Sequence, residues 1–355
     1  MLCVETDRMD VMNSVVAIRV DSSEQIGSGH LMRCLTLAER LRKDGTEVHF
    51  ISRDLAGSLH RLVAERGFIL HLLPQHEAHA TLTGYAAWLT VSQVVDAEET
   101  TAILRQLFPV DRLVVDSYAL DISWEQRIRP LVQEIFVIDD LANRRHDCDI
   151  LLDQNFYRAM EQRYDGLVPE KCKLLLGPRH ALLREEFYEA RKKLRPRDGS
   201  LRRILVFYGG SDPTYETEKV IHALLQMRLP PVDVDVVVGG SNTRRVQIEE
   251  VCAAHGFLHY HCQVSNMAKL MACADFALGA GGTTTWERCF LGLPAIVTAI
   301  AENQFEICRD CAEVGLIYYL GRWNEVTEVD IARAVSKFMS PQVLKDFQQA
   351  CGIHA

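Results

Sequence analysis

Short apolar runs alternate with segments of helical period along most of the chain, and this alternation predicts the fold class. In the first half, we expect strands at 15–20, 47–51, 68–73, 112–116, 135–139 and 149–152. Segments with one apolar helical face separate them, at 30–43, 57–66, 97–107 and 122–133. Strands that alternate with helices build parallel sheets with helices on both faces. The stretch 75–90 is less regular and predicts no element.

The same alternation restarts after a break. Residues 185–194 have helical period, and the segment 195–200 combines Pro, Gly and charge, which is typical of a linker. Beyond it we expect strands at 203–208, 232–238, 257–260, 275–278, 294–298 and 316–319. The expected helices lie at 214–227, 243–254, 265–273, 283–291, 303–313 and from 327 to the end.

This organisation predicts an α/β protein with two Rossmann-like domains and a cleft between them. The domains are expected at 14–194 and 201–355, joined by the linker 195–200. Residues 1–13 lack periodicity and are expected to form a disordered tail.

The composition limits the kinds of partner that the protein is expected to bind. The formal net charge of −9 argues against a nucleic-acid backbone as the main partner, because that role requires basic patches. No apolar run approaches the roughly 20 residues of a transmembrane helix, so we expect no membrane partner. The eleven cysteines are scattered, and Cys308 and Cys311 have no second pair, so we expect reduced thiols in the cytoplasm.

Two glycine-rich turns in the second half could bind phosphate. Each follows a strand and precedes a helix, where free backbone N–H groups favour anions. A single turn of this kind is weak evidence, and two in one domain strengthen the prediction. The candidate residues are Gly210 and Ser211 in the first turn, and Gly281, Gly282, Thr283 and Thr284 in the second.

Two further polar residues of this half have two interpretations each. Glu287 could accept two ribose hydroxyls or complement the dipole of its helix. Asn303, followed by Gln304, could cap a helix or reach a ligand.

The first half places a histidine in a glycine-rich turn. Gly29 and His30 follow the first strand and open a helix, at the end of a sheet that commonly holds ligands. The imidazole could serve as a general base, bind phosphate or be structural. Carboxylates also follow strands, at Asp21, Asp116 and the pair Asp139-Asp140. These carboxylates could bind sugar hydroxyls or polarise water, or serve as helix caps and turn acids.

The motifs resemble those of UDP-2,4-diacetamido-2,4,6-trideoxy-β-L-altropyranose hydrolases of pseudaminic acid biosynthesis. The similarity runs from about residue 16 to 340 and begins with Asp21-Ser22-Ser23-x-x-Ile26-Gly27-Ser28-Gly29-His30-x-Met32-Arg33-Cys34. It continues through Val115-Asp116-x-Tyr118, Asp139-Asp140-Leu141-Ala142-Asn143-Arg144, Asp153-Gln154-Asn155, Gly177-Pro178, Gly209-Gly210-Ser211-Asp212, Gly281-Gly282-Thr283-x-x-Trp286-Glu287 and Asn303-Gln304. The family often has Thr at the position of Ser28, which preserves a hydroxyl.

The resemblance implies a glycosyltransferase-B (GT-B) fold that is used for hydrolysis. The C-terminal domain would hold UDP and the N-terminal domain the sugar, without a metal or cofactor. Water would attack the anomeric carbon with inversion, and the histidine of the turn, His30, would act as base. The free sugar would serve pseudaminic acid synthesis, and with it flagellin glycosylation and cell-surface polysaccharide. The expected substrate-binding residues are Asp21, Gly29, Arg33, Tyr118, Arg184, Gly210, Ser211, Gly281, Gly282, Thr283, Thr284, Glu287, Asn303 and Gln304.

Two other functions remain open at this point. A glycosyltransferase of the same fold could pass the sugar to an acceptor, and a non-catalytic subunit could merely bind the nucleotide sugar. In each case the partner is a small-molecule UDP-sugar and the expected state is a monomer.

Overall fold

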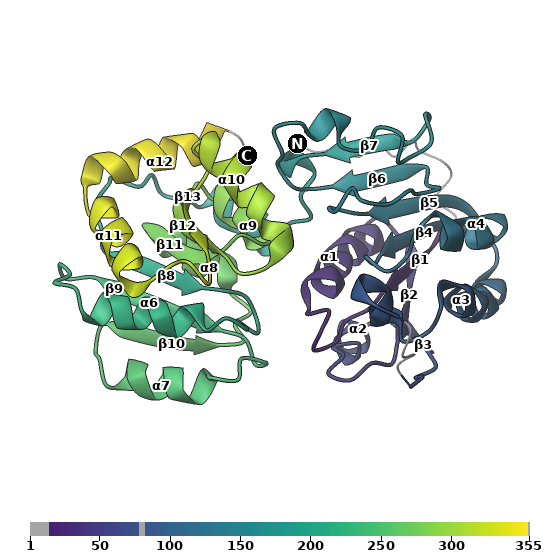
Figure 1. The fold of residues 1–355 in the computed structure, drawn as a ribbon, viewed down its shortest axis with the longest axis horizontal. Coiled ribbons are helices and arrows are strands. Elements are labelled where there is room, and N and C mark those ends of the chain that lie inside the picture. Colours follow the sequence, from purple (N-terminus) through teal and green to yellow (C-terminus); the bar gives the residue numbers. More distant parts are fainter. Residues whose placement is uncertain (1–13, 78–81, 354–355) are drawn as a thin grey trace. The chain divides into compact units, whose positions relative to one another are not determined.

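The computed structural model describes residues 14–77 and 82–353, so the expected tail at 1–13 lies outside the described residues. Within them the chain divides into two compact units (Figure 1). Of the described residues, the first unit comprises 14–77, 82–155 and 159–182, and the second comprises 156–158 and 183–353. Two parallel sheets, one in each unit, confirm the predicted α/β class.

The first unit is built on a seven-stranded sheet with the order β3-β2-β1-β4-β5-β6-β7. Its strands are all parallel and comprise β1 (Val15–Val20), β2 (Glu47–Arg53), β3 (Ile69–Leu73), β4 (Val110–Asp116), β5 (Val132–Ile138), β6 (Ile150–Asp153) and β7 (Lys173–Leu176). The helices are α1 (Gly29–Lys43), α2 (Arg61–Glu65), α3 (Gln93–Leu107) and α4 (Ile122–Ile128), with 3₁₀ helices at Gly84–Leu89, Arg129–Leu131, Met160–Gln162 and Pro178–His180.

Helices cover both faces of this sheet, which explains why its strands are apolar at nearly every position. Val16, Ile18 and Val20 of β1 pack with α1 and α2. Ala17, between them, points to the other face and packs with α3 and α4. The alternation therefore buries β1 from both sides.

The sequence pattern predicted too much helix and one strand too few in this unit. The segment 122–133 forms α4 and then a 3₁₀ turn that contains Pro130, because proline cannot donate the hydrogen bond that would continue the helix. β5 begins directly afterwards. β7 was not predicted, because only four residues form it and it lies at the sheet edge.

The second unit contains a six-stranded sheet with the order β10-β9-β8-β11-β12-β13. Its parallel strands are β8 (Arg203–Phe207), β9 (Asp233–Val238), β10 (Leu258–Cys262), β11 (Phe276–Ala280), β12 (Ala295–Ala299) and β13 (Tyr318–Arg322). The helices are α5 (Glu185–Lys192), α6 (Glu216–Leu225), α7 (Arg245–Ala253), α8 (Met267–Cys273), α9 (Thr284–Phe290), α10 (Phe305–Glu313), α11 (Glu328–Phe338) and α12 (Pro341–Ile353), with a 3₁₀ helix at Glu302–Gln304.

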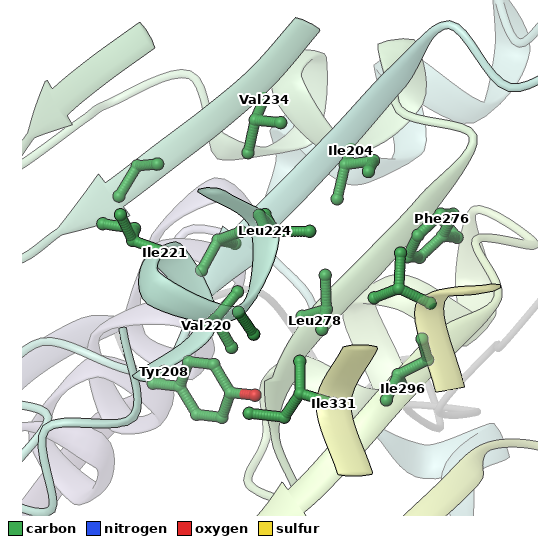
Figure 2. Packing of buried hydrophobic residues seen from close by; sticks show 14 of the residues in the cluster. Ile204, Tyr208, Val220, Ile221, Leu224, Val234, Phe276, Leu278, Ile296 and Ile331 are labelled. Atoms are coloured by element: carbon green, nitrogen blue, oxygen red, sulfur yellow. The ribbon is translucent and has the colours of Figure 1, made fainter. Parts of the chain in front are cut away.

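One face of this sheet carries a large aliphatic core. Figure 2 shows Val220 and Leu224 of α6 packed over Ile204 and Leu278 of the central strands β8 and β11. Tyr208 lies in the same core, at the end of β8. The core therefore supports the strand ends from which the glycine-rich turns start.

The segment 195–200 is tied to the second unit. Arg197 donates hydrogen bonds to the backbone carbonyls of Met271, Ala274, Leu291 and Gly292, at 2.8–3.0 Å. α5, just before it, also belongs to this unit, and the division between the units falls between 182 and 183.

Among the residues described, no helix is both long enough and apolar enough to span a membrane.

Candidate active site

The candidate site of the first unit lies where the strand order changes direction. β1 and β4 are neighbours in the sheet, although β2 and β3 separate them along the chain. After β1 a short turn leads into α1, which begins at Gly29, while β4 ends at Asp116. Open parallel sheets bind their ligands at the carboxyl ends of strands at such a point. His30, in the first turn of α1, and Asp116 meet here.

His30 is hydrogen-bonded to a buried carboxylate. Its Nδ1 lies 2.6 Å from Asp116 Oδ1. Arg33, one turn further along α1, contacts Asp116 through Nε to Oδ2 and Nη2 to Oδ1, each at 2.6 Å. Burial opposes ionisation of Asp116, but the charge of Arg33, followed by His30, holds the pKa of this carboxyl below its usual range. Asp116 is therefore ionised at neutral pH.

The ionised Asp116 determines which nitrogen of His30 carries the proton. A carboxylate only accepts hydrogen bonds, so Nδ1 donates. Nη2 of Arg33 also lies 3.1 Å from Nδ1, but a guanidinium only donates, so this contact is not a hydrogen bond in that tautomer. Within the described residues, no group is hydrogen-bonded to Nε2 of His30. This nitrogen has a lone pair that can take a proton from a ligand.

Aromatic rings pack against the imidazole, and a second carboxylate binds two of the side chains around it. Tyr118 lies edge-on to His30 with ring centroids 4.6 Å apart, and Trp88 lies 6.1 Å away. The hydroxyl of Tyr118 donates to Asp140 Oδ1 at 2.5 Å, and Arg33 Nη1 donates to Asp140 Oδ2 at 3.2 Å. The expected site residues Arg33 and Tyr118 thus gather around His30.

A third carboxyl group of this sheet edge differs from the others in its protonation. Asp153, at the end of β6, accepts a hydrogen bond from Tyr164 at 3.1 Å and lies near Arg163. Burial, with the negative charge of Asp140, raises the pKa of Asp153 to about 7. Among the residues described, no group of three or more His, Cys, Asp or Glu could hold a metal ion.

Asp21 takes part in a different network. Its Oδ1 accepts hydrogen bonds from Arg19 Nη1 at 2.6 Å and from the backbone N–H of Arg53 at 2.7 Å. Arg19 and Arg53 also bind the buried Asp96 of α3. This ion network joins β1, β2 and α3. Gly29 has open space around it, since a Cβ there would meet no atom within 4 Å.

The second glycine-rich turn of the second unit joins β11 to α9. A Cβ at Gly281 would lie 2.1 Å from Cys308 Sγ, so only glycine fits there. The backbone N–H groups of Gly282 and Thr283 have no hydrogen-bond acceptor within the part of the chain that the structure describes. Thr283 precedes α9 and Thr284 begins it, and neither hydroxyl caps the helix. The turn therefore presents N–H groups that could donate hydrogen bonds to an anion.

Glu287 of α9 has one paired and one unpaired oxygen. Its Oε1 accepts a hydrogen bond from Arg184 at 3.1 Å, and Arg184 also pairs with Glu186 at 2.6 Å. Its Oε2 is buried, with no hydrogen-bond partner among the described residues. Burial raises the pKa of Glu287 despite the charge of Arg184. A buried oxygen without a partner is costly, so this oxygen is suited to a ligand hydroxyl.

The first glycine-rich turn is organised by an aspartate. Asp212 has a positive φ of 43° and accepts hydrogen bonds from the backbone N–H groups of Glu216 and Thr217 at 3.0 and 2.8 Å. The carbonyl of Gly210 accepts from Ser241 Oγ at 3.2 Å. Ser211 is exposed beside it.

Asn303 and Gln304 lie in a 3₁₀ turn just before α10. Gln304 Oε1 accepts a hydrogen bond from the backbone N–H of Ile300 at 3.0 Å. Its Nε2 would lie 3.7 Å from a Cβ at Gly282, so it borders the turn after β11. Asn303 lies within the 3₁₀ turn and caps neither helix.

Sequence reasoning missed two side chains of these clusters. Trp88 lies in the 3₁₀ helix Gly84–Leu89, within the stretch 75–90 for which the sequence predicts no element. Arg288 follows Glu287 and is buried beneath the turn after β11. An arginine in an otherwise apolar helical face was the only sequence signal for it.

Comparison with solved structures identifies the fold as that of GT-B glycosyltransferases. A MurG from Acinetobacter baumannii aligns with a TM-score of 0.66 at 14% identity, covering 97% of this chain and 96% of that one. A UDP-glucosyltransferase from Polygonum tinctorium aligns with a TM-score of 0.68 at 13% identity, covering 96% and 93%. These likenesses confirm the expected fold.

Curated relatives confirm the resemblance seen in the motifs. A UDP-2,4-diacetamido-2,4,6-trideoxy-β-L-altropyranose hydrolase from Campylobacter jejuni is 27% identical over 256 residues, 72% of this chain and 81% of that protein. The spore coat polysaccharide biosynthesis protein SpsG of Bacillus subtilis is 23% identical, covering 93% and 90%. An uncharacterised Methanocaldococcus jannaschii protein, MJ1062, is 24% identical over 83% of this chain, which spans only 57% of that protein. No protein-family model matches the chain.

Proposed function

We propose that this protein hydrolyses a UDP-linked 2,4-diacetamido-2,4,6-trideoxy sugar at the anomeric C1–O bond, with inversion. The observation that carries the proposal is the His30–Asp116 pair, which leaves Nε2 of His30 without a hydrogen bond among the described residues. The similarity to the Campylobacter jejuni hydrolase supports the choice of sugar and reaction. In this proposal the free sugar is used for pseudaminic acid synthesis.

His30 would act as the general base. A water molecule gives its proton to Nε2 as its oxygen bonds to the anomeric carbon, while the C1–O bond to the diphosphate breaks and UDP leaves. Asp116 stabilises the imidazolium that forms and keeps Nδ1 protonated beforehand. A general base of this kind contributes about 10²–10⁴-fold to the rate.

The second unit would hold UDP. Gly282 and Thr283 offer N–H groups to the diphosphate, and fixed donors of this kind stabilise the charge that develops on a leaving group. The unpaired Oε2 of Glu287 is suited to a ribose hydroxyl. Arg184 supports this role, because it holds the other carboxylate oxygen and thereby orients the group.

Incubation with UDP-2,4-diacetamido-2,4,6-trideoxy-β-L-altropyranose and no acceptor tests the proposal. We expect UDP to be released, and NMR taken at once to detect the free sugar in the anomeric form opposite to that of the substrate. Absence of UDP release would refute hydrolysis. Retention of the anomeric configuration would refute direct attack by water.

The GT-B fold makes a glycosyltransferase the second candidate, because the two compared structures with this fold are a MurG and a UDP-glucosyltransferase. A transferase would release UDP only when an acceptor is added. A non-catalytic binding subunit would bind UDP without releasing it from the sugar under either condition. The same incubation, with and without a cell extract as the acceptor source, distinguishes the hydrolase, the transferase and the binding subunit.

A further inference from the structure

Arg288 is a buried cation within the second unit. It belongs to α9, and only 2% of its surface is exposed. Its Nη2 donates to the carbonyl of Ala280, the last residue of β11, at 2.8 Å, and to Thr285 Oγ1 at 3.0 Å. A Cβ at Gly279 would lie 2.7 Å from Nη1. The guanidinium therefore lies beneath the turn that joins β11 to α9.

No carboxylate in the described part of the chain forms an ion pair with this cation. Arg288 forms no ion pair among the described residues, and its buried Nε has no hydrogen-bond partner there. The acid nearest in sequence, Glu287, is instead paired with Arg184. Other buried arginines of this chain are compensated, as Arg19 is by Asp96. Arg288 is thus a buried cation that no carboxylate among the described residues contacts directly.

The charge of Glu287 also acts on Arg288, although the two side chains form no ion pair or hydrogen bond with each other. Two further titratable groups near Arg288, Cys308 and Tyr208, are neutral at pH 7. Burial raises the pKa of Cys308 to about 12 and also raises that of Tyr208. Figure 2 shows Tyr208 among apolar side chains at the end of β8, which explains the direction of its shift. Burial also lowers the pKa of Arg288 itself.

A purely structural role does not explain this arrangement well. One bond to a carbonyl and one to a hydroxyl could be made by a neutral donor, without the desolvation cost that an unpaired buried charge carries. The N–H groups of Gly282 and Thr283, on the same turn, lack acceptors among the described residues. An anion bound by these N–H groups would also be the missing counter-charge.

We propose that Arg288 is a positioning residue that acts through the turn at Gly281 and Gly282 as the buried counter-charge of a bound diphosphate. The inference rests on the proposed UDP site and adds to it the origin of the preference for a diphosphate over a monophosphate or a nucleoside. Arg288 holds the turn through the carbonyl of Ala280, and its field favours ligands with more negative charge at the turn.

Calorimetric titration of the R288M variant with UDP, UMP and uridine tests this role. A unit charge about 5–10 Å from an anion, at an effective dielectric constant of about 20, changes affinity by about 20- to 300-fold. We expect a loss of that size for UDP, a smaller loss for UMP and no change for uridine. An equal loss for all three ligands, or no loss for UDP, would overturn the inference.

Arg197→Met is the matched control. Arg197 also binds backbone carbonyls in this unit, including those of Leu291 and Gly292 beyond the other end of α9. Its loss should not change the ratio of UDP to uridine affinity. If wild-type protein binds no UDP, the proposed function fails; if it binds UDP and R288M binds equally well, only the role of Arg288 fails.

The R288K variant provides a second measurement that does not depend on the methionine variant folding. A buried lysine loses its proton more readily than arginine, because burial lowers its pKa well below about 10. We expect R288K to bind UDP almost like wild type at about pH 6 and to lose affinity by about pH 9, where wild type keeps its charge. A loss of UDP affinity independent of pH would overturn the inference.

Discussion

Arg33 donates hydrogen bonds to both oxygens of Asp116, each at 2.6 Å, so the carboxylate that orients His30 is shared with a guanidinium one helical turn away. Two consequences follow from this sharing. Arg33 keeps Asp116 ionised, and its charge reduces the extent to which Asp116 stabilises the imidazolium of His30. Arg33 therefore acts on His30 through the carboxylate that both side chains contact.

Replacement of Arg33 by methionine is expected to lower kcat for UDP release by about 10-fold or more, because Asp116 loses the hydrogen bonds that fix its position against His30. Arg33→Lys keeps a positive charge beside Asp116 and should retain more of the rate. Steady-state measurements of UDP release compare wild type with the two variants. An unchanged kcat in R33M would contradict the assigned coupling.

Removal of the imidazole is expected to separate chemistry from binding. His30→Ala should lower kcat for UDP release by at least about 100-fold, because it removes the proposed acceptor of the water proton. Its UDP affinity, measured by calorimetry, should stay within about 2-fold of wild type, since His30 belongs to the first unit and the proposed nucleotide site to the second. A matched loss of affinity and turnover would instead indicate a binding role.

Replacement of Glu287 by alanine is expected to weaken UDP binding through the ribose. The loss of hydrogen bonds to a buried carboxyl group should reduce affinity by about 10- to 100-fold. With 2′,3′-dideoxy-UDP, which lacks both hydroxyls, wild type and variant should bind nearly alike. Calorimetry of both proteins with both ligands gives the four affinities that this comparison needs. An equal loss with both ligands would contradict the ribose role and indicate that Glu287 supports the turn through Arg184.

Much of the fold could be predicted from the sequence because strands buried on both faces are apolar throughout. β1 and β4 were both recognised in this way, and with them the positions of His30 and Asp116 at strand ends. The order of the strands in the sheet was not predicted. It is this order that brings Asp116 next to His30, a distance of 86 residues along the chain.

The parts of the site that escaped prediction depend on contacts with no local pattern. Trp88 lies in a 3₁₀ helix whose sequence has no clear period, so its approach to His30 could not be inferred. Asp21 has the sequence context of a site residue, but its carboxylate accepts hydrogen bonds from the Arg19 side chain and the Arg53 backbone N–H. The sequence also does not reveal that Arg288 is buried without an ion pair among the described residues, because the spacing of residues does not show which side chains the fold buries.

The carboxyl group of Asp153 makes stability depend on pH in the direction opposite to that of most buried aspartates. Its pKa is raised to about 7, whereas an aspartate in the unfolded chain titrates near 3.9. The folded state therefore binds more protons than the unfolded state in this window, and this contribution to stability is lost as the pH rises from about 4 through about 7. Asp116 and Asp139 have lowered pKa values, so their opposite contributions fall at more acidic pH.

Urea unfolding of wild type and Asp153→Asn across this window measures the effect. Asparagine resembles the protonated carboxyl group and does not titrate, so the free energy of unfolding of wild type should fall relative to that of the variant as the pH rises from about 5 to about 8. The slope should not exceed about 1.4 kcal/mol per pH unit, the limit for one proton. Because other titrating groups are common to both proteins, they cancel in the difference. A difference that stays constant or grows with pH would show that Asp153 is already ionised in the folded protein.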